Sequence, residues 1–134
     1  FERNRNQYYD LLMSTSRTGD VVPWLRFFLR GVATQASDAE ERTVRLVELQ
    51  NELRNELLAA KATMTTLRTA ELLFSTPYVS ATWLADRLDV TYPTAQAAIG
   101  ALVERGELTE ATGRQRNRFY MANRIFEAVY GAPR

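Results

Sequence analysis

Residues 80–106 have the hydrophobic pattern of a helix-turn-helix, and this motif constrains the fold more than any other part of the sequence. Leu84 and Leu88 occupy one face of a short first helix, and the period breaks directly after them. Thr91 is a residue type that caps helices, and Pro93 fits the first turn of a helix because no N–H is needed there. The second helix then carries apolar side chains at steps of three and four residues: Ala95, Ala98, Ile99 and Leu102.

A β-hairpin is expected directly after this motif. Residues 107–110 favour a short strand, a turn follows, and residues 117–121 favour a second strand with Phe119 and Met121 facing inward. A hairpin that follows a recognition helix is a wing, so we expect a winged helix-turn-helix domain over residues 64–134. Three positively charged side chains fall between the two strands of this wing: Arg114, Arg116 and Arg118.

The N-terminal part, residues 1–63, predicts helices only. We expect a first helix near residues 4–16, an apolar helix over 24–32 and a long charged helix over 37–62 that connects to the winged domain. The fold class is therefore mainly α, with a small β-hairpin. The long helix carries one apolar stripe at an average step of 3.6 residues, which indicates a straight helix: Leu46, Leu49, Leu53, Leu57, Ala60 and Met64.

The helix over 24–32 is apolar almost all round, as buried helices are. Three interpretations remain open for it: it belongs to an ordinary core, it forms a homodimer interface, or it packs on a domain missing from this chain.

Composition excludes several classes of site. The chain has 134 residues, of which 46% are apolar and 25% charged, as in globular proteins. It contains no cysteine and no histidine, so thiolate metal sites, disulfides and the commonest general base are excluded. We expect no catalytic residue, no metal and no cofactor. No apolar run reaches the length of a membrane span, and the absence of cysteine fits a cytoplasmic location.

The order of the motifs resembles the C-terminal part of Fic-family proteins. Residues 4–12, Asn-Arg-Asn-Gln-Tyr-Tyr-Asp-Leu-Leu, are similar to the helix that follows the active-site loop in that family. Gly19-Asp20 and residues 23–29, Pro-Trp-Leu-Arg-Phe-Phe-Leu, are similar to its next helix. Many members continue with a long helix and a winged helix-turn-helix domain, so the resemblance spans nearly the whole chain.

The resemblance implies a parent protein that transfers AMP from ATP to a hydroxyl group of a target protein. The family's catalytic loop contains a histidine base and a glycine-rich anion-binding turn, and this chain has neither. No catalytic residue carries over, so we expect this chain to be non-catalytic. Because the sequence starts at Phe1 within a helical pattern, we expect it to be a piece of a longer protein whose catalytic domain is missing here.

The first functional hypothesis is a module that binds double-stranded DNA. We assign phosphate contacts to the wing arginines, with Thr91 and Thr94 adding neutral hydrogen bonds at the start of the recognition helix. Gln96 is the candidate base reader because a side-chain amide pairs with adenine through two hydrogen bonds. Tyr92 is expected to contact a thymine methyl group or a phosphate.

The alternative hypothesis is a protein-interaction or dimerisation module that positions a substrate or partner for a Fic enzyme. Residues 91–103 contain no lysine or arginine, so the recognition helix offers little charge to DNA. Wing arginines that pair with nearby glutamates favour this alternative, whereas wing arginines free in solvent favour DNA.

Overall fold

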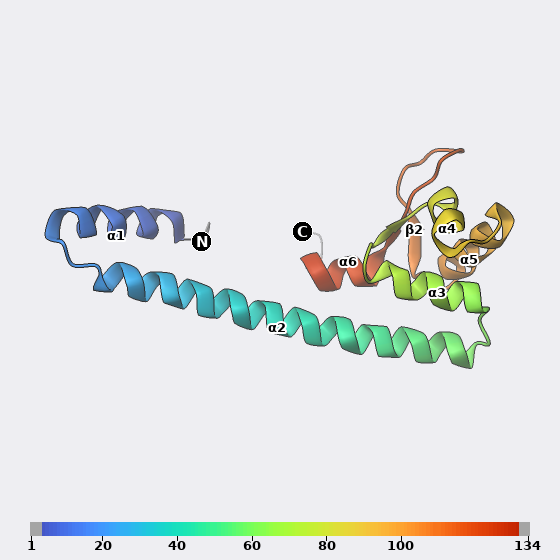
Figure 1. The fold of residues 1–134 in the computed structure, drawn as a ribbon, viewed down its shortest axis with the longest axis horizontal. Coiled ribbons are helices and arrows are strands. Elements are labelled where there is room, and N and C mark those ends of the chain that lie inside the picture. The colour runs from blue at the N-terminus through green and yellow to red at the C-terminus, as the bar shows by residue number, and fades with distance from the viewer. Residues whose placement is uncertain (1–3, 132–134) are drawn as a thin grey trace. The chain divides into compact units, whose positions relative to one another are not determined.

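The computed structural model describes residues 4–131 and confirms a mainly helical fold with a small antiparallel three-stranded sheet (Figure 1). The chain divides into two compact units, Phe1–Glu41 and Arg42–Arg134. The expected boundary at 63/64 differs from this division, because the C-terminal half of the long helix packs with the winged domain. Among residues 4–131, none of the helices combines the length and apolar character that a membrane crossing requires.

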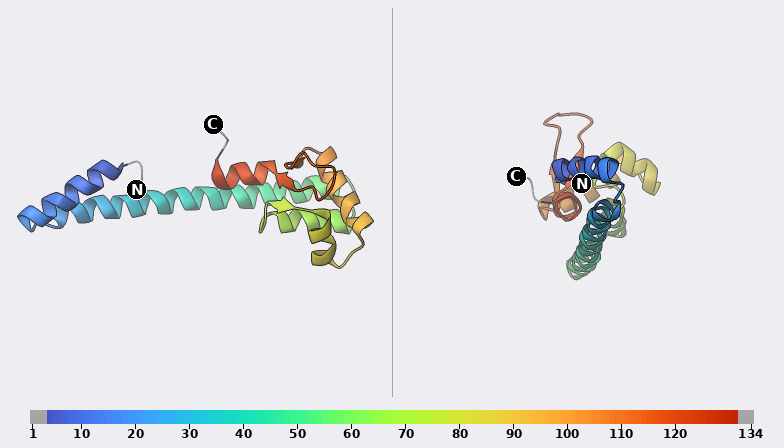
Figure 2. Two further views of the ribbon diagram at one scale, coloured as in Figure 1. Left: turned by 90° about the horizontal axis from the view of Figure 1, so that it is seen from above. Right: turned by 90° about the vertical axis from the view of Figure 1, so that its left-hand side faces the viewer.

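The first unit contains helix α1 (Arg5–Thr18) and the beginning of α2 (Val22–Ala59). Gly19 ends α1 in the left-handed conformation, with φ of 73°. The Asp20 carboxylate then accepts a hydrogen bond of 3.1 Å from the N–H of Val22, as expected of a capping residue. The two helices lie side by side in both figures, and the Tyr8 ring meets the Phe27 ring at 6.3 Å (Figures 1 and 2).

Helix α2 is continuous over 38 residues, so the prediction of separate helices over 24–32 and 37–62 is wrong. Residues 33–36 are Ala-Thr-Gln-Ala, which contain neither proline nor glycine, and no side chain there stops the helix. The prediction of a buried helix over 24–32 is also wrong, since Leu25, Leu29 and Val32 are all exposed. Among the described residues, an ordinary core around this segment is excluded.

The core of the second unit lies between α2, α3 (Met64–Leu73), α4 (Ala81–Leu88) and α5 (Tyr92–Glu104). The expected stripe on α2 stops short: Ala60 and Met64 are exposed because the helix ends at Ala59. The side chains buried almost completely in this core come from all four helices: Leu53, Leu57, Leu73, Leu84, Ile99 and Leu102.

The helix-turn-helix prediction is confirmed in detail. Ser80 and Thr91 cap α4 and α5 through their hydroxyls, which accept hydrogen bonds of 3.2 and 3.3 Å from the N–H groups of Trp83 and Thr94. Asp89 ends α4 with φ of 53°, in the left-handed conformation that short polar residues tolerate. The turn therefore works with aspartate where such turns more often have glycine.

Three short strands close the second unit: β1 (Tyr78–Val79), β2 (Leu108–Glu110) and β3 (Tyr120–Ala122), in the order β1-β3-β2. Strand β1 pairs with the second strand of the wing, where Val79 lies opposite Tyr120. Helix α6 (Asn123–Tyr130) follows β3 directly and contributes Ile125 to the core.

The predicted facing of the second wing strand is wrong. Phe119 is 47% exposed and Met121 is only half-buried, whereas Tyr120 and Ala122 are 6% and 1% exposed. Because side chains alternate along a strand, a shift of one residue exchanges the two faces. The segment Phe-Tyr-Met-Ala has an apolar residue at every position, so the alternation alone does not decide which face is buried.

Candidate nucleic-acid interface

The start of α5 is held by two threonines that bond to each other. The hydroxyls of Thr91 and Thr94 lie 2.8 Å apart, and Thr91 Oγ1 also accepts the Thr94 N–H. Both side chains are exposed, but their first role is to cap the helix. The cap fixes where α5 begins, and with it the direction in which Tyr92 and Gln96 project.

A groove of about 310 Å³ lies between the start of α4, the start of α5 and the wing. Tyr92 and Gln96 are four residues apart, so they project from the same face of α5. The wing contributes Arg116 and Arg118 to the lining of the same groove. Four of the seven predicted DNA-binding residues are thus brought together, whereas Thr91, Thr94 and Arg114 do not line the groove.

Three further polar side chains line the groove and were not predicted. Gln115 and Asn117 alternate with the wing arginines, so the sequence Arg-Gln-Arg-Asn-Arg contained the signal that would have found them. Asn117 has φ of 53°, a conformation that asparagine tolerates better than most residues. Thr82 belongs to the first turn of α4 and carries no comparable signal in the sequence.

Glu110 at the end of β2 stabilises the base of the wing through hydrogen bonds. Its carboxylate accepts hydrogen bonds from the Thr112 hydroxyl, from the Thr112 N–H at 2.9 Å and from the Gly113 N–H at 2.8 Å. The Thr112 hydroxyl contributes most to holding the pKa of this carboxyl below its ordinary value, and the nearby positive charge of Arg118 adds to the effect. The same hydrogen bonds therefore favour the ionised form of Glu110 and hold the turn at residues 112–113.

The wing arginines present their charge to solvent. Arg114, Arg116 and Arg118 are exposed, and within residues 4–131 no carboxylate oxygen lies within 4.0 Å of their nitrogens. Arg118 Nε donates a 2.6 Å hydrogen bond to the Arg114 carbonyl, which shapes the loop without neutralising either side chain. Of the two arrangements expected for the wing, this one is closer to a wing free in solvent.

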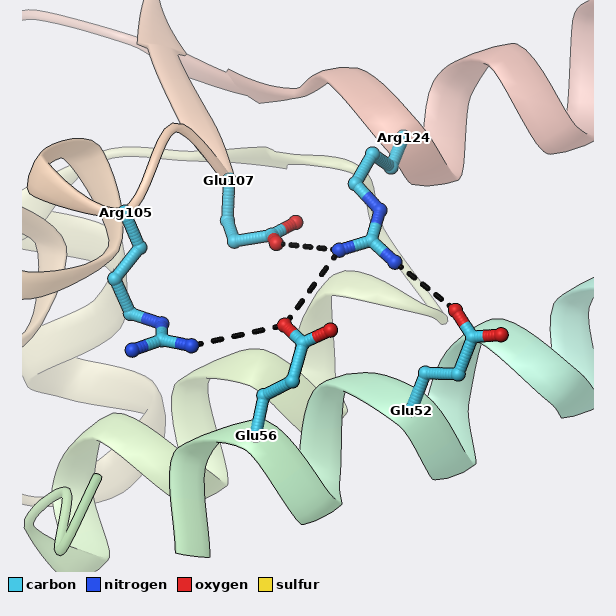
Figure 3. Close-up of polar contacts among 5 residues, drawn as sticks. All are labelled: Glu52, Glu56, Arg105, Glu107 and Arg124. Carbon is cyan, nitrogen blue, oxygen red and sulfur yellow. Dashed lines mark hydrogen bonds and ion pairs between the residues drawn. The ribbon is translucent and has the colours of Figure 1, made fainter. Parts of the chain in front are cut away.

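A second polar cluster lies on the other side of the unit, where α6 and the end of α5 meet α2 (Figure 3). Arg124 is its centre and contacts Glu107 at 2.7 Å, Glu52 at 3.2 Å and Glu56 at 3.7 Å. Arg105 joins from the end of α5, 3.6 Å from Glu56. The Glu107 side chain is almost buried, so loss of Arg124 would leave its carboxylate without a partner, and the same arginine also contacts Glu52 and Glu56 of α2.

The sequence did not predict this cluster, because its members are far apart along the chain. Glu52 and Arg124 are separated by 72 residues and meet only once α2 is packed on the domain. Among residues 4–131, no group of three or more acidic residues has the arrangement of a metal site. No protein-family model matches the chain, and no curated protein is significantly similar to it.

Proposed function

We propose that the second unit is a DNA-binding winged helix-turn-helix module, with the groove between α5 and the wing as its contact surface. The observation that carries the proposal is that Arg116 and Arg118 of the wing line the same groove as Tyr92 and Gln96 of α5. A helix that enters the major groove, with cations beside it, has the two parts such binding needs: base contacts and phosphate contacts.

The wing supplies the phosphate contacts in this proposal. Three exposed arginines bind three phosphates, and each phosphate contact adds about 0.9 to the negative slope of log K against log salt. The expected slope is therefore about −2.7 for one copy of the chain. Helix α5 adds no charge to this, because Tyr92–Glu104 contains no lysine or arginine.

In this proposal, the exposed, uncharged side chains of α5 recognise the DNA bases. Gln96 offers one donor and one acceptor, which match adenine in the major groove. Tyr92 stands one turn earlier on the same face, 56% exposed, and offers both a ring for a thymine methyl group and a hydroxyl for a phosphate.

Fluorescence anisotropy with a labelled pool of random duplexes, titrated with salt, tests the proposal. We compare the chain with an Arg114→Ala/Arg116→Ala/Arg118→Ala variant and with an Arg42→Ala/Arg45→Ala/Arg54→Ala control that loses the same charge from the exposed surface of α2. The wing variant is expected to lose most of the salt slope, and the control is expected to keep it. No binding at low salt, or equal losses in both variants, would contradict the proposal.

A second candidate function is protein interaction, favoured by an aromatic cluster between β1 and α6. Tyr78, Phe126 and Tyr130 form a chain of ring contacts at 6.1 and 4.7 Å. Tyr78 is 44% and Tyr130 is 69% exposed, so the cluster offers a contiguous aromatic surface to a partner. In this alternative, the module positions a substrate or partner protein for a Fic adenylyltransferase.

The Fic relationship itself remains part of the proposal. It rests on the sequence motifs alone, residues 4–12 and 23–29, followed by a long helix and a winged domain. The chain lacks the catalytic histidine of that family, so we propose that it has no AMP-transfer activity of its own. Incubation with labelled ATP and a mixture of candidate target proteins tests this, and label transferred by the purified chain would contradict it.

A further inference from the structure

The first unit has an exposed apolar face. Within residues 4–41, nine large apolar side chains are between 39% and 62% exposed. No side chain in this range is buried, although α1 and α2 pack against each other. The Trp24 indole Nε1 is buried and has no acceptor within the described chain. Two helices of this length do not form a stable core by themselves, because so short a chain removes too little apolar surface from water.

The exposed rows of the two helices lie on the same side of the hairpin. In each helix, the exposed row directly follows a residue whose ring meets the other helix: Tyr9 follows Tyr8, and Phe28 follows Phe27. One residue turns a helix by about 100°. Because α1 and α2 run in opposite directions (Figure 1), the same rotation carries both rows to one side.

The size of this face fits an interface between two copies. Large aromatic side chains bury about 150–250 Å² when fully covered and aliphatic ones less. The eight of these side chains that belong to α1 and α2 are about half exposed, so they leave on the order of 600 Å² of apolar surface. Two copies would together bury about 1,200 Å² of apolar area. Because about 65% of a homodimer interface is apolar, the total would be roughly 1,800 Å², which lies within the usual range of stable interfaces.

The charge of the hairpin permits two copies to meet. Residues 4–41 contain four arginines and five acidic residues, so the segment is close to neutral. We propose that this face binds the same face of a second copy of the chain, and that the two hairpins form a four-helix interface. The proposal goes beyond DNA binding and does not depend on it.

Sedimentation equilibrium without DNA tests the proposal. The chain is expected to have twice its mass of 15.3 kDa at micromolar concentration. Leu29→Glu places a charge in the face and should raise the dissociation constant at least tenfold, because burying an unpaired carboxylate is unfavourable. Val44→Glu, at an exposed position of α2 outside the face, is the matched control and should leave the mass unchanged.

A monomer at every micromolar concentration would overturn the proposal and would indicate that another protein or chain segment covers this face. Equal dissociation by both glutamate variants would also overturn it. Circular dichroism checks that the helices of each variant are intact.

A labelling experiment tests the same face without adding a charge. The chain has no cysteine, so Leu25→Cys and Val44→Cys each introduce a single thiol. Maleimide labelling at position 25 should become slower as the protein concentration rises, while labelling at position 44 should not change. Equal labelling rates at all concentrations would contradict the dimer.

Discussion

Both units contain helices with large apolar side chains, yet only one of them buries those side chains. In the second unit, α2, α3, α4 and α5 surround Leu53 and Ile99, which are almost fully covered. In the first unit, α1 and α2 contact each other along one side only, and Leu29 is 61% exposed. Two paired helices are therefore not sufficient for a core; further elements must cover the apolar side that each helix leaves exposed.

The difference also separates two kinds of functional surface. The surface proposed for DNA in the second unit is polar and is positioned by caps, a turn and the three-stranded sheet. The surface proposed for a second copy in the first unit is apolar and positioned only by a helix pair. A unit with its own core can hold polar side chains in fixed positions for specific contacts. A unit without a core offers only apolar surface to a partner.

The largest expected effect is on the core of the second unit. Leu53→Ala should lower its free energy of unfolding by about 2–5 kcal/mol, because it removes a buried side chain and leaves a cavity. Leu29→Ala in the first unit should change the free energy of unfolding of the second unit by less than about 0.5 kcal/mol. Urea unfolding followed by the fluorescence of Trp83, in a Trp24→Phe background, measures both. Equal losses of unfolding free energy in the two variants would show that the two units unfold together and would contradict the difference drawn between them.

A smaller effect is expected at the ion-pair cluster. Arg124→Ala leaves the nearly buried Glu107 carboxylate without its partner, and we expect a loss of about 1–2 kcal/mol, reduced because the Arg124 side chain is 38% exposed. Arg54→Ala on the exposed surface of α2 should cost less than about 0.5 kcal/mol. The same Trp83 signal measures both variants. Equal stability of the two would show that the Arg124 ion pairs do not stabilise the second unit.

The cap of the recognition helix should contribute somewhat less. Thr91→Ala removes the acceptor for the Thr94 N–H and is expected to cost about 1 kcal/mol, while Thr91→Ser keeps the hydroxyl and should cost little. Thermal unfolding followed by circular dichroism measures the difference. If Ala and Ser behave alike, the position of α5 does not depend on this cap.

The smallest expected effect is the pH dependence of the wing. The folded-state pKa of Glu110 lies below the ordinary value of 4.5, so its contribution to stability is complete above that value and is lost as the pH falls through the folded pKa. The amide signals of Thr112 and Gly113 should report this loss by NMR, and Glu110→Gln should abolish its pH dependence. Amide shifts that stay unchanged down to pH 3 would place the folded-state pKa of Glu110 below 3. If the Thr112 and Gly113 amides titrate identically in the Glu110→Gln variant, Glu110 is excluded as the cause.

Local signals predicted the second unit well. The caps at Ser80 and Thr91 and the turn at Asp89 depend on neighbouring residues, so the sequence contains all that decides them. The groove was predicted in part for the same reason: Tyr92 and Gln96 are placed by helical spacing, and the arginines by the hairpin.

Signals that depend on distant parts of the chain were missed. The facing of Phe119 and Met121 is decided by the core beneath the sheet, and the four apolar residues in a row did not reveal it. The division into separate helices over 24–32 and 37–62 failed because no residue stops α2. The Arg124 cluster requires the packing of α2, which no local pattern encodes.

The measurement that tests the central claim most directly is the NMR mapping of amide shifts when duplex DNA is added to the full chain. The account predicts that the largest changes fall at the start of α5 and in the wing, at Tyr92, Gln96 and residues 114–118, and that they diminish as salt is added. The amides of Tyr78, Phe126 and Tyr130 should remain unchanged. Absence of any shift at low salt, or shifts confined to the aromatic cluster, would contradict the DNA-binding groove.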